Sequence, residues 1–266
     1  SSHFGSSPPI RCRVPLHERM PAPGLWELCL GRLARLCLAG ADPPVDELPE
    51  AIARQVLALA SSLPVESREG HSAVWDCFLR RRPPPELHLG GAGTHISALP
   101  APALAALREL SLGPAEVNDA ALAPLGLAAS LESLRLSHCP RVTGSFLAAM
   151  GECSQLASLL CYGCSALEDA SMRHAARLPL RRLSLSGAEC LSDGAVALLC
   201  ATALGLRHLD LSRTAITDAS AGLLGRLSSL EALLLSRTAG LSAAVVLWLA
   251  RGLRLRAALP DRPRVL

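Results

Sequence analysis

Aromatic residues are scarce in this sequence: three Phe, three Trp and one Tyr make up 3% of the 266 residues. Half of the residues are nevertheless apolar, so the core must be built from Leu, Ala and Val. Such a core favours many similar thin layers over one globular core around large rings. Long apolar runs are also missing, because Arg interrupts the two richest windows, Leu25–Leu38 and Ala243–Leu259. A membrane span needs about 20 apolar residues, so none is expected.

A strong excess of one charge is absent as well. The net charge is +3, which predicts no marked attraction to nucleic acid or to a membrane surface. No secretory signal is visible. The ten cysteines are spread over a chain far larger than disulfide-stapled scaffolds, so a reducing cytoplasmic or nuclear setting is expected.

A six-residue pattern, L-x-x-L-x-L, recurs through the second half of the chain. Copies start at Leu107, Leu131, Leu156, Leu180, Leu206 and Leu230, separated by 24, 25, 24, 26 and 24 residues, and a degenerate copy, PPELHL, starts at Pro84. A second phrase follows each copy, as in VNDAAL, ITDASA and LSDGAV, with a Ser, Thr, Asn or Asp suited to a helix N-cap. Each repeat is therefore predicted to be a short parallel strand, a turn and a helix. Stacked copies would form an α/β solenoid with the leucines buried between the strand row and the helix row.

These repeats resemble leucine-rich repeats, and more closely the cysteine-containing subtype common in substrate receptors of ubiquitin ligases. LESLRLSHC, LASLLCYGC and ITDASAGLL carry the resemblance, which covers about residues 84–255. The ninth template position departs from the subtype. It is Cys139 and Cys164 in two copies but Ala or Thr in the others, so only a partial buried ladder is expected.

Cys161-x-x-Cys164 is the one spacing that suits a zinc or redox site. The repeat register favours two small buried apolar residues instead, because Cys164 takes the ninth position and Cys161 replaces the third leucine. The histidines are scattered, and GGAGTH lacks a phosphate-loop pattern. No catalytic residue, metal or cofactor is therefore expected, and the protein is predicted not to be an enzyme.

Strand alternation points the residues between the template leucines away from the core. The residues at these outward positions form a cationic surface that suits an acidic or phosphorylated peptide. Serines at 133, 137, 184, 186, 212 and 236 lie between them. The predicted substrate-binding residues are Arg135, Tyr162, Arg182, His208, Asp210, Arg213 and Arg237. The alternative is that they are merely soluble positions on a strand row.

Two segments ahead of the repeats resemble a VHL-type box. GLWELCLGRLARL predicts an amphipathic helix with Leu25, Leu28, Cys29 and Leu33 on one face. After a turn-rich break, Leu48-Pro49 opens a second predicted helix that continues through Ile52. The two halves match the forms L-x-x-x-C-x-x-x-Φ and Φ-P-x-Φ.

This order of parts is similar to the Zyg/Zer family of substrate receptors for cullin-2 ubiquitin ligases. The resemblance implies that the first helix docks on elongin B/C, the second segment contacts cullin-2, and the remainder presents a protein substrate. Family members continue into an armadillo-like array credited with degron recognition. The sequence stops at Leu266, so either it is a fragment that lacks this array or the repeats themselves hold the substrate. The degron specificity of the family is therefore not carried over.

Two other interpretations remain open. DELPEAIARQVLAL also resembles the start of an F-box, although little room follows for its remaining helices. Alternatively, the chain is a plain repeat scaffold whose Leu25 helix caps the solenoid by packing on Leu79 and Leu87. The expected organisation is a leader at 1–20 with Met20 as a candidate start, a box-like segment at 21–62, a linker at 63–83, repeats at 84–256 and a tail at 257–266.

Overall fold

A computed structural model describes residue 45 and residues 77–81, 83–89, 96, 99–202 and 205–252. The adaptor-binding residues predicted above, Leu25, Leu28, Cys29, Leu33, Leu48, Pro49 and Ile52, lie outside the described residues. In the described part no helix is long and apolar enough to cross a bilayer.

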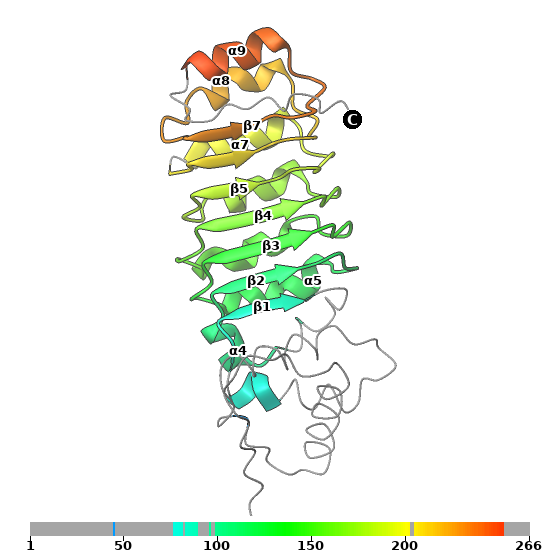
Figure 1. The fold of residues 1–266 in the computed structure, drawn as a ribbon, viewed down its shortest axis with the longest axis vertical. Coiled ribbons are helices and arrows are strands. Elements are labelled where there is room, and N and C mark those ends of the chain that lie inside the picture. Colours follow the sequence, from blue (N-terminus) through cyan, green and yellow to red (C-terminus); the bar gives the residue numbers. More distant parts are fainter. Residues whose placement is uncertain are drawn as a thin grey trace, which may run out of the picture.

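Within the described residues, seven short strands form one parallel sheet in the order β1 to β7, so each strand pairs with its neighbours in sequence. Figure 1 shows them stacked in one layer, with the helices along one face of the sheet. The strands are β1 (Glu86–Leu89), β2 (Glu109–Leu112), β3 (Ser133–Ser137), β4 (Ser158–Tyr162), β5 (Arg182–Ser184), β6 (His208–Asp210) and β7 (Ala232–Leu234). This confirms the predicted α/β leucine-rich-repeat solenoid, and the degenerate copy at Pro84 supplies β1.

The leucine template sets the register. Leu87 pairs with Leu110, Leu110 with Leu134, and the same template position continues to β7. Template leucines are buried in every described repeat except at Leu235, which is half-buried in the last one, whereas the residues between them face away from the helices. A slip of one residue would expose every leucine, so the pattern fixes the pairing.

The side opposite the strands is less regular than the sequence predicts. A repeat of about 24 residues leaves few for a helix, and several copies form short or 3-10 turns. Pro124 stands near the start of one of them, and Gly144 precedes another with φ 92°. The α-helices are α4 (Ala101–Ala106), α5 (Asp119–Leu122), α6 (Met172–Ala175), α7 (Asp193–Thr202), α8 (Ala221–Leu224) and α9 (Ala243–Gly252). The 3-10 helices are η4 (Ala123–Leu127), η5 (Ser145–Glu152), η6 (Asp169–Ser171) and η7 (Asp218–Ser220).

The buried core extends ahead of the first strand. Residues 77–81, inside the segment expected to be a linker, are helical. Phe78 and Leu79 are fully buried in the same cluster as the repeat leucines. The solenoid core therefore begins before Pro84.

Candidate protein-binding face

The sheet has one face that the helices do not cover, which we call the free face. It consists of the third, fifth and seventh template positions of each repeat, together with the eighth position at the turn that follows each strand. Arg135 and Arg182 are exposed on it, while Tyr162, His208 and Asp210 are half-buried. Arg213 and Arg237 are exposed at the turns after β6 and β7. All seven predicted substrate-binding residues thus come from one side of the sheet, spread from β3 to the turn after β7.

The serines of this face are less accessible than predicted. Ser184 and Ser212 are only 4% and 8% exposed. The Ser184 hydroxyl donates to Asp210 Oδ2 at 3.1 Å, and the Ser212 backbone N–H donates to Asp210 Oδ1 at 3.0 Å. The expectation of an exposed serine lining is therefore wrong at these two positions. Asp210 uses its carboxylate to join β5 to β6.

The turns after β3 to β7 have a left-handed backbone at the eighth template position. Glycine adopts this conformation at Gly163 (φ 63°) and Gly187 (φ 78°). The neighbouring repeats instead place His138, Arg213 and Arg237 there, with φ of 53°, 57° and 55°. A left-handed conformation costs a residue with a Cβ about 1–2 kcal/mol relative to the right-handed one. Three repeats therefore carry a strain that glycine would relieve.

Ion pairs neutralise part of the charge at the edge of the free face. Arg108 pairs with Glu132 at 3.4 Å, and Arg207 pairs with Glu231 at 3.3 Å. Both pairs are exposed, so each contributes at most about 1 kcal/mol. Arg182, which lies between them on β5, has no ion-pair partner among the residues that the structure describes. Arg135 on β3 also lacks one within the described part, so unpaired positive charge extends along the free face from β3 to the last described turns.

Two apolar residues on the free face were missed by the sequence reasoning. Leu160 and Leu234 occupy the fifth template position of β4 and β7, where the other repeats carry His, Ser, Arg or Asp. Leu234 is 39% exposed. The signal was present in the sequence, because a leucine at an outward position breaks the alternation that the template prescribes.

His208 has one nitrogen without a partner. Its Nδ1 is buried and makes no hydrogen bond within the described part of the chain. The ring lies on β6 in register with Arg182 on β5 and Ala232 on β7. An orphaned buried nitrogen next to an exposed arginine makes this strand position costly to the fold.

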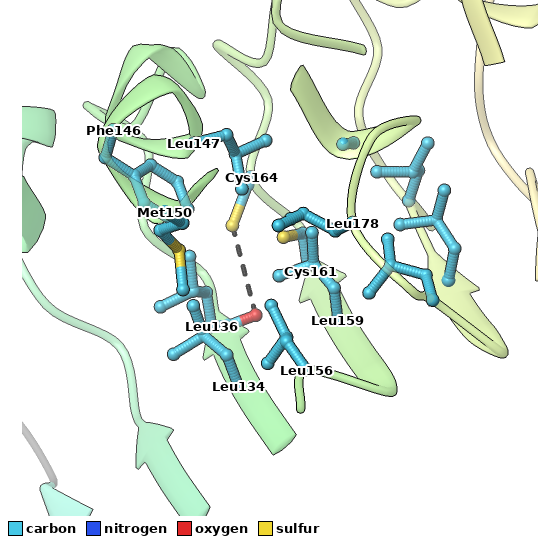
Figure 2. Close-up of a cluster of buried hydrophobic side chains, with 14 of the residues drawn as sticks. Leu134, Leu136, Phe146, Leu147, Met150, Leu156, Leu159, Cys161, Cys164 and Leu178 are labelled. Atoms are coloured by element: carbon cyan, nitrogen blue, oxygen red, sulfur yellow. Dashed lines mark hydrogen bonds between the residues drawn. The ribbon is translucent and has the colours of Figure 1, made fainter. Parts of the chain in front are cut away.

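Cys161 and Cys164 are 1% and 0% exposed, which confirms the prediction of two buried structural cysteines. Figure 2 shows both sulfurs among leucines, with the Cys164 thiol directed at the Leu136 carbonyl oxygen of the preceding repeat, 3.9 Å away. Contact with Cys139 lowers the pKa of Cys164, but contact with Cys161 and burial outweigh it and raise this pKa to about 12. The thiol therefore stays protonated at neutral pH. Among the described residues no group of three potential ligands could hold a metal ion.

The buried ladder at the ninth position is more complete than predicted. In the last two described repeats Thr replaces Cys and also donates to a backbone carbonyl at the end of a strand. The Thr214 hydroxyl donates to the Leu211 carbonyl at 2.7 Å, and the Thr238 hydroxyl donates to the Leu235 carbonyl at 3.0 Å. Both side chains are buried. A small donor of either type thus satisfies the carbonyls that the turn leaves unpaired.

The aspartates of the second phrase were expected to cap helices, and the structure gives them another role. Asn118 and Thr217 do cap their helices, accepting from the N–H groups of Ala121 and Ala219. Asp119 instead reaches the next repeat, where it accepts from the backbone and hydroxyl of Thr143 at 2.8 and 3.0 Å. The same contact recurs from three further aspartates to the next repeat: Asp169 to Ser192, Asp193 to Thr217 and Asp218 to Ser242. These aspartates join consecutive repeats at the helix side.

Neither a protein-family model nor a curated protein sequence matches the chain. Among solved structures, an internalin (InlF) from Listeria monocytogenes is 15% identical with a TM-score of 0.45, over 62% of this chain and 45% of its own. The yeast Rad7 and Elc1 complex is 18% identical with a TM-score of 0.48, over 84% of this chain and 56% of its own. The chain thus spans about half the length of these two. The assignment of the fold rests on the strand register and the buried template leucines.

Proposed function

We propose that this chain is the substrate-recognition subunit of an elongin B/C–cullin-2 type ubiquitin ligase and does no catalysis itself. The segment from Leu25 docks on elongin B/C, the Leu48-Pro49 segment contacts the cullin, and the repeats hold a protein substrate. Other subunits transfer ubiquitin, and this chain contributes by bringing the substrate close. The observation that carries the proposal is the order of parts in the sequence: two box-like segments stand directly ahead of leucine-rich repeats.

The described repeats support the substrate half of this proposal. Seven parallel strands give a free face without covering helices, and uncompensated arginines and exposed leucine lie on it. Recognition of a protein by charge and apolar contact needs no metal or activated nucleophile. The thiols of the Cys139–Cys164 pair are buried and held protonated, which suits packing between repeats.

The start of the core bears on the F-box alternative. That interpretation needs further F-box helices after residue 60. Phe78 and Leu79 already belong to the solenoid core, so these helices would have to fit between residues 60 and 77. The elongin interpretation needs no helix there.

The test is co-purification of the full chain with co-expressed elongin B/C. The double variant Leu25→Ala with Cys29→Ala should lose elongin, because it removes the apolar side chains of the docking face. Glu27→Ala is the matched control: helical spacing places it opposite Leu25, and it should retain elongin. A Skp-type adaptor is offered in parallel. Elongin retained by the double variant, or capture of the Skp-type adaptor instead, would refute the proposal.

A further inference from the structure

Two arginines stand side by side at the last described turns of the free face. Arg213 and Arg237 hold the same template position in consecutive repeats, and both are exposed. The Arg213 backbone N–H donates to the Ser236 carbonyl at 2.9 Å, so the two turns are directly adjacent. Neighbouring strands of a sheet lie about 4.8 Å apart, which brings both guanidinium groups within reach of one ligand side chain.

The eighth template positions of consecutive repeats lie close together. A Cβ built on Gly187 would lie 3.2 Å from Gly163 Cα, and one built on Gly163 would lie 2.5 Å from His138 Nδ1. A side chain at this position can therefore contact the same position of a neighbouring repeat, as the His138 ring does over Gly163.

This arrangement is unfavourable for the isolated chain. Both residues adopt left-handed backbone angles that glycine adopts freely at the same position two repeats earlier. Like charges on adjacent strands also repel each other. Neither Arg213 nor Arg237 has an ion-pair partner in the described chain. Strain and repulsion that nothing within the fold offsets are typical of a ligand-binding position.

The acidic groups nearby are already engaged. Asp210 accepts from Ser184 at 3.1 Å and from the Ser212 backbone at 3.0 Å. Glu231 pairs with Arg207 at 3.3 Å. Neither carboxylate is therefore free for Arg213 or Arg237, and an anion from outside the described residues can pair with both arginines. Every strongly basic residue in the sequence is Arg, whose planar fork suits a carboxylate or a phosphate.

An exposed apolar residue lies beside this basic pair. Leu234 points to the free face on β7, three residues before Arg237, and is 39% exposed. An extended strand advances about 3.3 Å per residue, and the chain turns at residues 236–237, so the two positions are less than about 10 Å apart. In an extended peptide lying along β7, side chains two residues apart share one face and lie about 7 Å apart, which fits this spacing.

A protein segment fits this surface better than nucleic acid does. Glu86 and Glu109 lie on the same free face at its other end, and the net charge of the chain is only +3. Tyr162 is the sole tyrosine of the sequence, and it gives no series of stacking platforms for bases.

We propose that Leu234, Arg213 and Arg237 form a recognition site for an extended substrate segment with an apolar residue and an anionic residue two positions apart, on the same face of the segment. The two arginines hold the carboxylate or phosphate, and Leu234 contacts the apolar side chain. This inference rests on the proposed function, because it defines which segment of a substrate the repeats hold.

The experiment measures fluorescence anisotropy of labelled ten-residue Gly/Ser peptides with the full chain at low salt. The probe carries one Leu and, two residues later, a phosphoserine. Companion peptides carry Asp or Ser in place of the phosphoserine, or have the Leu moved by one residue to the opposite face. We expect the phosphoserine probe to bind at least about tenfold more tightly than the Ser peptide, since charge-assisted hydrogen bonds are the strong ones. Binding of the Asp peptide would extend the site to carboxylates, and its failure would restrict the site to phosphate.

The variant is Arg213→Gly with Arg237→Gly. It should weaken binding of the phosphoserine probe at least about tenfold. It should also keep the fold, because glycine suits both turns. The matched control, Arg173→Ala with Arg177→Ala, removes the same charge from exposed positions at the helix side and should change binding less than about twofold. The proposed site would be refuted if wild type and the glycine variant bound the phosphoserine probe equally, or if wild type bound the Ser peptide as tightly as the probe. It would also be refuted if a single-stranded oligonucleotide competed for the site as effectively as unlabelled probe. Elongin B/C is absent from this assay. A failure here therefore leaves the co-purification result unaffected.

Discussion

The aspartates at the helix side provide a graded test of what holds neighbouring repeats together. Among described residues, Asp119 accepts four hydrogen bonds from the next repeat: two from Thr143 and one each from the N–H groups of Gly144 and Phe146, at 2.8–3.1 Å. Asp193 accepts three, Asp169 two and Asp218 one. The same residue type thus joins successive repeats with four, three, two and one hydrogen bonds.

The cost of removing each aspartate should follow this order. A hydrogen bond to a charged acceptor contributes about 1.5–3 kcal/mol when buried, and about 1 kcal/mol is reasonable at these partly exposed sites. Replacement of Asp119 by Ala should therefore lower the free energy of unfolding by about 4 kcal/mol, because three backbone N–H groups and one hydroxyl lose their partner. Asp218→Ala, which removes a single bond at 2.7 Å, should cost about 1 kcal/mol or less.

Urea unfolding of the full chain, followed by far-UV circular dichroism, measures these differences as shifts in midpoint at constant slope. Asp119→Asn keeps one acceptor oxygen and should fall between wild type and Asp119→Ala. Equal losses for Asp119→Ala and Asp218→Ala, or a larger loss for Asp218→Ala, would refute the idea that these hydrogen bonds carry the coupling between repeats.

Four further predictions concern single positions. Burial raises the pKa of Asp119, but hydrogen bonds from the next repeat outweigh it and hold the pKa below its usual value. The contribution of Asp119 to stability is therefore complete above about pH 4 and is lost as the pH falls through the pKa of the folded state. In acid titrations Asp119→Asn should show a shallower loss of stability than wild type. Gly144→Ala should lower the free energy of unfolding by about 2 kcal/mol or more in urea melts, because φ is 92° and an added Cβ would lie 2.5 Å from a buried serine hydroxyl. Exposed Cys190 should be alkylated by iodoacetamide in the native protein at pH 8, while buried Cys164 should stay unlabelled by peptide-level mass spectrometry. Arg213→Gly should raise the thermal midpoint, since about 1 kcal/mol of left-handed strain exceeds the added chain entropy of glycine; a lower midpoint would show that the turn is not strained.

The strands and the core could be predicted from the sequence because one periodic signal determines both. Leucine at the first, fourth and sixth template positions leaves one register that buries all copies, and the pairing of Leu110 with Leu134 follows it. Cysteine burial followed for the same reason, since Cys164 falls at a core position of the template. These features depend on hydrophobic burial, which a linear pattern records directly.

The contacts between repeats could not be predicted in this way. Asp119 and Asn118 are adjacent polar residues at a helix start, and both suit a cap by local rules. Their roles differ because Thr143 of the next repeat offers two donors to Asp119 alone, at 2.8 and 3.0 Å. The left-handed turns were missed similarly. Gly163 and Gly187 indicate such a backbone, but Arg213 at the same position gives no local sign of it.

The separation of these contacts along the solenoid shapes what each experiment can show. In a repeat array each copy touches only its neighbours, so a change is felt mainly in the adjacent repeats. Arg213 and Arg237 belong to the last described repeats, whereas Phe78 and Leu79 lie in the core at the opposite end of the sheet, next to β1 in sequence. A substitution at the basic turns should therefore alter peptide binding and local strain without reaching the segment proposed to dock on elongin. If Arg213→Gly with Arg237→Gly also abolished elongin co-purification, the two ends would be coupled, and the assignment of adaptor and substrate binding to separate parts of the chain would be wrong.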